Sequence, residues 1–252
     1  MQQAEKANKL KALHVAGSPL VLYNIWDAGS SRVLARNGAK AIATGSWSVA
    51  AAQGYRDGEF IPLDFVLMIV ERITKTTDLP VTVDFEGGYA VEPEPLAVNV
   101  TRIIQAGAVG INFEDQIVGG SGLHSISDQV ERIEAVRKAA TDADVPLFIN
   151  ARTDLFLKES DASVHASLID DAIERMSAFD EAGADGFFVP GLTDKELVRE
   201  VCAQSSLPVN VMVKGDLNNI SEIQTLGVSR ISFGPGPYFS AVEDLTARVS
   251  MV

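Results

Sequence analysis

Glycine and proline recur along this chain at a spacing that alternates helices with strands. Four glycines each follow a helical stretch and precede an apolar run, a position that suits the left-handed end of a helix. Three prolines each open an apolar run, as the first residue of a strand permits. In chain order these residues are Gly38, Pro80, Gly107, Pro146, Gly183, Pro208 and Gly227. With the apolar run Leu20–Tyr23 in front of them, they predict eight strands.

The expected strands are Leu20–Tyr23, Ala41–Thr44, Val81–Asp84, Gly110–Glu114, Leu147–Ala151, Gly186–Val189, Val209–Val213 and Arg230–Phe233. Amphipathic segments between them predict helices. These are Pro62–Thr76, Ser127–Thr141, Ser163–Ala182, Asp194–Gln204, Ile220–Leu226 and Pro237–Val249, with Ala4–Ala16 as an extra helix before the first strand. Eight alternations in 252 residues predict one (β/α)8 barrel, the TIM-barrel fold, as a single domain over residues 1–252. The alternative is a doubly wound open sheet.

The composition excludes several classes of function. A net charge of −13 disfavours binding to nucleic acid. No apolar run approaches the ~18 residues that a membrane-spanning helix needs, and residues 1–17 lack the apolar core of a signal peptide. The single cysteine, Cys202, cannot form an internal disulfide. We therefore expect a complete cytoplasmic protein that binds neither nucleic acid nor membrane.

Acidic residues stand where three of the expected strands end. Asp84 and Glu86 close the third strand, Glu114 and Asp115 close the fourth, and Asp154 follows the fifth. Asp84 and Glu86 are two residues apart, so a regular strand would point both to one side. Carboxylates at the end of a buried strand are costly unless they are paired or bind a metal. We expect these strand ends to converge on a hard divalent cation; the alternative for each is a solvated acidic turn or surface pair.

Three further segments add candidate groups. Arg152 is the only cation among the strand-end clusters, and it suits a two-pronged grip on a carboxylate or phosphonate or, alternatively, an ion pair with Glu114 or Asp115. The small residues around Gly45 and Ser46 predict exposed backbone N–H groups for an anion, although glycine–serine turns are common. Asp57, in the polar loop after the second strand, supplies a carboxylate within reach of metal-bound water.

The loop after the fourth strand is rich in glycine, which predicts a pliable lid over the site or, alternatively, a simple flexible turn. His124, in this loop, is the only histidine placed for general acid–base catalysis. His14, His165 and Cys202 fall in expected helices, where we expect packing roles.

Five short motifs, taken in order, give the chain a resemblance to the phosphoenolpyruvate mutase / isocitrate lyase superfamily. They are Ala43–Ser46, Gly54–Gly58, Asp84–Tyr89, Gly110–Gln116 and Asn150–Asp154. The resemblance covers most of the chain, from Asn24 to Gly234. It implies a barrel, usually a homo-oligomer such as a dimer or tetramer, that binds Mg²⁺ (with Mn²⁺ as the alternative) and a 2-oxo or 2-hydroxy carboxylate.

The resemblance also implies roles for individual residues. Asp84 would ligate the metal directly, and metal-bound waters would be held by Asp57, Glu86 and Glu114. The substrate would be held by the backbone amides of Gly45, Ser46 and Trp47, by the Arg152 guanidinium, and by Asn210.

The chain departs from the two well-defined branches of this superfamily. Lyases that cleave isocitrate or 2-methylisocitrate carry a Lys-Cys-Gly-His-type loop after the fourth strand, whereas residues 119–124 here contain no cysteine. The mutase proper has an asparagine in this loop, and none lies between Gln116 and Ser127. Pro190 stands where mutases tend to carry a histidine. The chain therefore resembles a less defined branch.

The first functional hypothesis is a Mg²⁺-dependent lyase that cleaves a carbon–carbon bond of an oxaloacetate-like acid through a metal-stabilised enolate. Ser121 or His124, on the closing loop, would handle the proton. The second hypothesis is P–C bond cleavage or phosphoryl migration in a phosphonopyruvate-type substrate, which would make the chain a hydrolase or an isomerase. The third is a barrel that binds an oxo acid without turnover.

Overall fold

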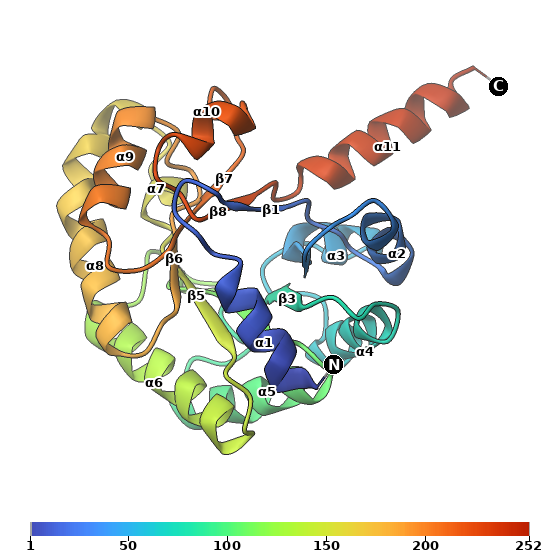
Figure 1. The fold of residues 1–252 in the computed structure, drawn as a ribbon, viewed down its shortest axis with the longest axis horizontal. Helices are drawn as coiled ribbons and strands as arrows, with labels where there is room; N and C mark the ends of the chain where they lie inside the picture. Colours follow the sequence, from blue (N-terminus) through green and yellow to red (C-terminus); the bar gives the residue numbers. More distant parts are fainter. Residues whose placement is uncertain (1, 252) are drawn as a thin grey trace.

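The computed structural model describes residues 2–251. Eight parallel strands form a nearly closed barrel with helices around it (Figure 1), so the predicted (β/α)8 fold is confirmed. The strands are β1 (Leu20–Leu22), β2 (Ile42–Ala43), β3 (Val81–Asp84), β4 (Gly110–Glu114), β5 (Phe148–Arg152), β6 (Gly186–Phe188), β7 (Val209–Met212) and β8 (Arg230–Ser232). Their ends lie within one residue of the expected ends.

The barrel closes between β1 and β2 through residues that follow both strands. Hydrogen-bonded ladders join all the remaining neighbouring pairs of strands, including β8 with β1. Ile25 forms a parallel bridge with Thr44, and its amide donates to the carbonyl of Ala43 at 2.8 Å. Asn24 strengthens this corner, because its side chain donates to the Thr44 carbonyl (2.8 Å) and accepts from the Gly234 amide (3.0 Å).

The helices are α1 (Gln3–Ala12), α2 (Ala28–Arg36), α3 (Ser46–Ala52), α4 (Leu63–Thr74), α5 (Pro93–Gln105), α6 (Ile126–Asp142), α7 (Leu155–Lys158), α8 (Ile169–Glu181), α9 (Lys195–Gln204), α10 (Ile220–Gln224) and α11 (Gly236–Val249). The expected helix Ser163–Ala182 is divided, because residues Ala162–Leu168 form the 3₁₀ helix η1 and α8 follows. The hydroxyl of Ser167 donates to the Val164 carbonyl at 2.7 Å. Such local bonds compete with a regular α-helix.

The extra N-terminal helix, α1, packs against the end of the barrel where the strands begin. Leu10 is fully buried there, and a Cβ atom at Gly110 would lie 2.7 Å from its Cδ2 atom, so this contact requires glycine. The side chain of Gln3 donates to the carbonyls of Ile104 and Ala108 at 2.7 and 2.9 Å. With this end covered, the opposite rim of the barrel is left for ligands.

The last helix, α11, leaves the barrel and projects away from it (Figure 1). Residues 239–251 are all exposed, including several large apolar side chains. Within residues 2–251, no helix combines the length and the apolar character that crossing a bilayer requires.

Candidate active site

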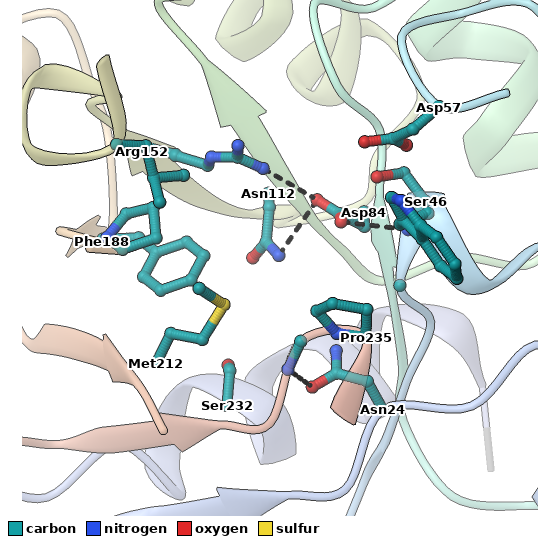
Figure 2. A pocket seen from close by; sticks show the side chains of 15 residues that line it. Asn24, Ser46, Asp57, Asp84, Asn112, Arg152, Phe188, Met212, Ser232 and Pro235 are labelled. Carbon is teal, nitrogen blue, oxygen red and sulfur yellow. Dashed lines mark hydrogen bonds and ion pairs between the residues drawn. The ribbon is translucent and has the colours of Figure 1, made fainter. Parts of the chain in front are cut away.

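A cavity of about 190 Å³ opens among the C-terminal ends of the strands (Figure 2). Its wall contains Asn24, Gly45, Ser46, Trp47, Asp57, Asp84, Asn112, Arg152, Leu157, Phe188, Pro190, Met212, Ser232, Gly234 and Pro235. Six of the predicted site residues are therefore on one wall: the Gly45–Trp47 segment, Asp57, Asp84 and Arg152. Glu86 and Glu114 are buried behind this wall.

Asp84, the last residue of β3, occupies the centre of the acidic side of the cavity (Figure 2). Its Oδ2 atom accepts a hydrogen bond from the backbone amide of Ser46 at 3.0 Å, and its Oδ1 atom accepts one from Nδ2 of Asn112 at 3.3 Å. One donor on each oxygen fixes the carboxylate, and an ionised carboxylate keeps further lone pairs for a ligand.

The amides predicted to bind a substrate anion are partly committed elsewhere. The Ser46 amide donates to Asp84, and the Gly45 amide donates to the Ile25 carbonyl at 3.2 Å. These residues begin the short helix α3 rather than an open anion-binding turn. Among the described residues, only the Trp47 amide of these three has no hydrogen-bond acceptor. Binding of a substrate anion by these three amides stays a prediction, and the Gly45 and Ser46 amides would have to exchange their present acceptors to do it.

Glu86 reaches the site for a reason that differs from the predicted one. The strand ends at Asp84, and Glu86 has a φ angle of 51°, in the left-handed region that is strained for residues other than glycine. Its carboxylate accepts from the amides of Gly58 and Glu59, both at 2.9 Å. A turn, and not the two-residue period of a strand, therefore brings Glu86 to the loop that carries Asp57.

Arg152 connects three carboxylates across the rim. Its Nη1 atom lies 2.9 Å from Oε2 of Glu114 and 3.8 Å from Oδ1 of Asp84. Its Nε and Nη2 atoms donate to the two oxygens of Asp154 at 2.6 and 2.9 Å. Burial opposes the arginine charge, but Glu114 and Asp154 outweigh it and raise the pKa of Arg152 well above its usual value. Three of its five N–H donors are used in this way, which leaves two for an anion in the cavity.

Like charges crowd the acidic side of the cavity. Burial, together with the charges of Asp57 and Glu114, raises the pKa of Glu86 to about 9. Burial and the charge of Asp84 raise the pKa of Asp57. Burial also raises the pKa of Glu114 to about 8, although Arg152 acts in the opposite direction. A divalent cation among these carboxylates would reverse the repulsion that disfavours their ionised forms.

The donor set fits a hydrated metal ion. Among residues 2–251, no three His, Cys, Asp or Glu side chains are arranged to ligate one ion directly. Mg²⁺ usually keeps several waters and binds through one or two carboxylates. Asp84 and Asp57 on the cavity wall match that pattern, and Glu86 and Glu114 stand behind them.

Three predicted residues lie away from the cavity. Asn210, in β7, is fully buried, and its Oδ1 atom accepts from the hydroxyl of Ser232 at 3.2 Å. Ser121 is exposed in the loop between β4 and α6. His124 lines a separate cavity with Glu59 and Arg132, and burial lowers the pKa of its imidazole. Ser121 and His124 therefore reach the cavity only if the loop moves.

The loop is anchored at its base and open at its tip. Gln116 forms an antiparallel bridge with Leu123, and its side chain donates to Glu114 at 2.9 Å. At Gly119 and Gly122 an added Cβ atom would meet no atom within 4 Å. Asp115, next to the loop, accepts from Arg175 at 3.2 Å, so its carboxylate pairs with Arg175 and not with Arg152.

Several residues of the cavity were not predicted from the sequence. Asn112 precedes Glu114 by two residues in β4, and this period could have indicated it. The apolar residues Leu157, Phe188 and Met212 carry no such signal, because buried core positions have the same composition.

The family model described as phosphoenolpyruvate phosphomutase matches residues 10–252. The chain belongs to the phosphoenolpyruvate mutase / isocitrate lyase superfamily. This superfamily consists of enzymes that act on oxo acids. The 2-methylisocitrate lyase of Escherichia coli K12 is 31% identical over 242 residues, which cover 93% of this chain and 73% of that enzyme. An oxaloacetate decarboxylase of Chromohalobacter salexigens is 28% identical over 255 residues, which cover 96% of this chain and 83% of that enzyme.

A solved structure from Burkholderia cenocepacia J2315, which carries the provisional name phosphonomutase, has the same architecture as the present chain. It has a TM-score of 0.96 and 46% identity, and the match covers 99% of both chains.

Proposed function

We propose that this chain is a Mg²⁺-dependent lyase that cleaves a carbon–carbon bond in a small 2-oxo or 2-hydroxy carboxylate related to oxaloacetate. The observation that carries the proposal is the division of the cavity. Asp84, Asp57 and Ser46 lie on one side, and Phe188 and Met212 face them from the other (Figure 2). The acidic side suits a cation together with the oxygens of an oxo acid. The apolar side suits the substrate group that becomes uncharged when the carbon–carbon bond breaks.

The metal would be held directly by Asp84, and its waters by Asp57, Glu86 and Glu114, with Mn²⁺ as a substitute. When bound, the cation supplies Lewis-acid stabilisation of negative charge on a substrate oxygen. A phosphonopyruvate hydrolase of this fold, 19% identical with a TM-score of 0.82, was solved with oxalate and Mg²⁺. At that identity the likeness concerns the fold, so the assignment here rests on the crowded carboxylates.

Arg152 would orient the substrate with its two remaining N–H donors, and the Trp47 amide would supply a third donor. The proton would come from the loop between β4 and α6. Ser121 is the first candidate because it is exposed in a segment where Gly119 and Gly122 have open space around them, and His124 is the second. Asn210 would act beneath the cavity through Ser232 rather than by touching the substrate.

The decisive experiment compares pyruvate release from oxaloacetate with phosphate release from phosphonopyruvate, each with Mg²⁺ and with EDTA. Asp84→Ala is the test variant, and Asp142→Ala, which removes an exposed carboxylate paired with Lys138, is the matched control. The proposal requires metal-dependent pyruvate release in the wild type and the control that is lost in Asp84→Ala. Equal rates in all three proteins would refute it, because free Mg²⁺ alone would then account for the reaction.

Phosphonate chemistry is the second candidate, and the name of the relative that is 46% identical favours it. Against it, Arg152 is the only cationic side chain that residues 2–251 place on the cavity wall, and Pro190 is also part of that wall. A phosphonate carries more charge than a carboxylate and would need further donors. Phosphate release that exceeds pyruvate release would reverse the order of the two candidates. Tight binding of pyruvate with no product in either assay would support the third hypothesis, a non-catalytic oxo-acid-binding barrel.

We also propose that the protein is a cytoplasmic homo-oligomer that assembles through α11. This projecting helix exposes an apolar stripe of side chains at helical spacing, made of Phe239, Val242, Leu245 and Val249. The outward side chains Val21 and Tyr23, on and next to β1, are also exposed, although helices normally cover the outside of such a barrel. An uncovered strand and an unpartnered apolar helix on the same chain complement each other between two copies.

A further inference from the structure

Arg230 is buried inside the barrel without a carboxylate partner. It is the first residue of β8, its side chain is fully buried, and no ion pair joins it to any Asp or Glu of residues 2–251. Its Nη1 atom has no hydrogen-bond partner there. A buried charge without a counter-charge is costly, so a stable core alone does not explain this arginine.

The guanidinium fixes the direction of the hydrogen bonds beneath the cavity. Its Nη2 atom donates to Oδ1 of Asn112 at 3.1 Å, and its Nε atom donates to Oγ of Ser232 at 3.3 Å. Because a guanidinium only donates, Asn112 must turn its carbonyl oxygen toward Arg230. The amide group of Asn112 is then left to donate to Asp84, at 3.3 Å.

Both side chains that accept from Arg230, Asn112 and Ser232, line the cavity. Asn112 also connects Arg230 to Asp84, the proposed metal ligand. Asn150 supports the same orientation, since its Nδ2 atom donates to Oδ1 of Asn112 at 2.9 Å. If Asn112 turned over, its carbonyl oxygen would face the Asp84 carboxylate and repel it. Burial lowers the pKa of Arg230 to about 10, while Asp84 acts in the opposite direction, so the guanidinium is charged at neutral pH.

We propose that Arg230 is a positioning residue of the active site. It holds the Asn112 amide toward Asp84 and places a positive charge beneath the acidic side of the cavity. The inference rests on the proposed function, because it concerns the residue assigned to the metal. It also makes a separate claim about the protein without metal, namely that Arg230 sets the orientation of the Asn112 side chain.

The first test uses Arg230→Met, which keeps much of the volume and removes the charge, and Arg230→Lys, which keeps the charge with a different donor geometry. Binding of oxalate with Mg²⁺ is measured by calorimetry, beside the thermal midpoint. We expect Arg230→Met to melt at or above the wild-type temperature, because an unpaired buried charge is removed. It should bind oxalate with Mg²⁺ roughly 10–100-fold more weakly, the usual effect of losing a group that orients a metal ligand. The affinity of Arg230→Lys for oxalate should lie between those of the wild type and Arg230→Met.

Arg137→Met is the matched control. Arg137 donates to the carbonyls of Gly183 and Leu147 and pairs with Asp185, away from the cavity. This variant should melt lower than the wild type and bind oxalate normally. A folded Arg230→Met protein that binds oxalate as tightly as the wild type would overturn the proposal. If Arg230→Met does not fold, Arg230→Lys decides: wild-type affinity in that variant overturns the positioning role.

The second test uses the metal-free protein. The side-chain amide signal of Asn112 in a ¹H–¹⁵N spectrum is assigned by its loss in Asn112→Ala, and we expect it to shift in Arg230→Met and to stay in place in Arg137→Met. An unmoved signal in Arg230→Met contradicts the inference. This result is independent of the metal. If wild type and Asp84→Ala bind Mg²⁺ and oxalate equally, the proposed function fails while the Asn112 signal still tests Arg230.

Discussion

Nη1 of Arg152 lies 2.9 Å from Oε2 of Glu114, and the two residues are register partners where β4 and β5 end. Both side chains are largely buried. The pair therefore belongs to the barrel ladder and to the wall of the cavity at once, so a substitution here changes stability and activity together.

Arg152→Leu should destabilise the protein as well as inactivate it. It leaves Glu114 buried and unpaired, a change that costs about 3–5 kcal/mol in comparable buried pairs. Arg152→Lys should cost less stability, because a charge remains, yet should still lose most activity, because the two-pronged grip is gone. Denaturant unfolding and kcat/KM measure the two effects separately. Arg152→Lys with wild-type kcat/KM would exclude a substrate role for the guanidinium.

Mg²⁺ should raise the thermal midpoint of the wild type, with the logarithm of its concentration once that exceeds the dissociation constant, because a ligand that binds only the folded state stabilises it. Asp84→Asn should lose this response and keep the fold, since it preserves the shape of the side chain. Glu86→Gln should weaken the response less, because Glu86 would contact the metal only through water. A full response in Asp84→Asn would place the metal elsewhere.

Leu245→Glu should weaken self-association, because it places a charge in the apolar stripe of α11. Sedimentation analysis should show a smaller species than the wild type at equal concentration. Ala247→Glu adds the same charge on the opposite side of the helix and should leave the assembly unchanged. If neither variant changes the sedimentation coefficient, α11 does not hold the copies together.

The barrel was predictable because each strand after the first is a short apolar run that follows a glycine or a proline. β3 and β4 match their expected bounds, since a carboxylate ends each run at the rim. The short helices α3 and α7 were not expected, because so few residues show no helical period. The division of residues 162–181 depends on local side-chain bonds, from Ser163 to the Asp161 carboxylate and from Ser167 to the Val164 carbonyl, which helical periodicity does not register.

The acidic half of the site was predictable because its carboxylates stand where apolar strand runs end. The other parts of the site depend on how loops fold back onto the barrel. The position of Glu86 follows from a left-handed turn, and the commitment of the Ser46 amide follows from its approach to Asp84. His124 lies in a different cavity because the loop base is held between Gln116 and Leu123. Arg230 has no sequence signal, since a lone arginine at the start of a strand is normally read as a surface residue.

His14 should make the protein less stable in acid. Its ring stacks on Phe148 with centroids 4.1 Å apart, and its Nδ1 atom bonds to the Leu10 carbonyl at 2.8 Å. Burial, together with the charge of Arg230, lowers its pKa to about 3, against the opposing effect of Asp185. Between pH 6.5 and about 3 the unfolded chain therefore binds a proton that the folded chain does not. The contribution of His14 to the free energy of unfolding is fully present above pH 6.5 and falls with decreasing pH by about 1.4 kcal/mol per unit.

His14→Phe removes the titrating group and keeps an aromatic ring against Phe148, so its free energy of unfolding should fall less steeply than that of the wild type between pH 6.5 and 4. The difference between the two denaturation curves isolates the histidine, because the carboxylates titrate equally in both. Arg230→Met supplies an independent check. Without the neighbouring guanidinium the imidazolium is less disfavoured, so the acid dependence should shrink while His14 is still present. Parallel curves for wild type and His14→Phe would show that His14 can take up its proton without unfolding.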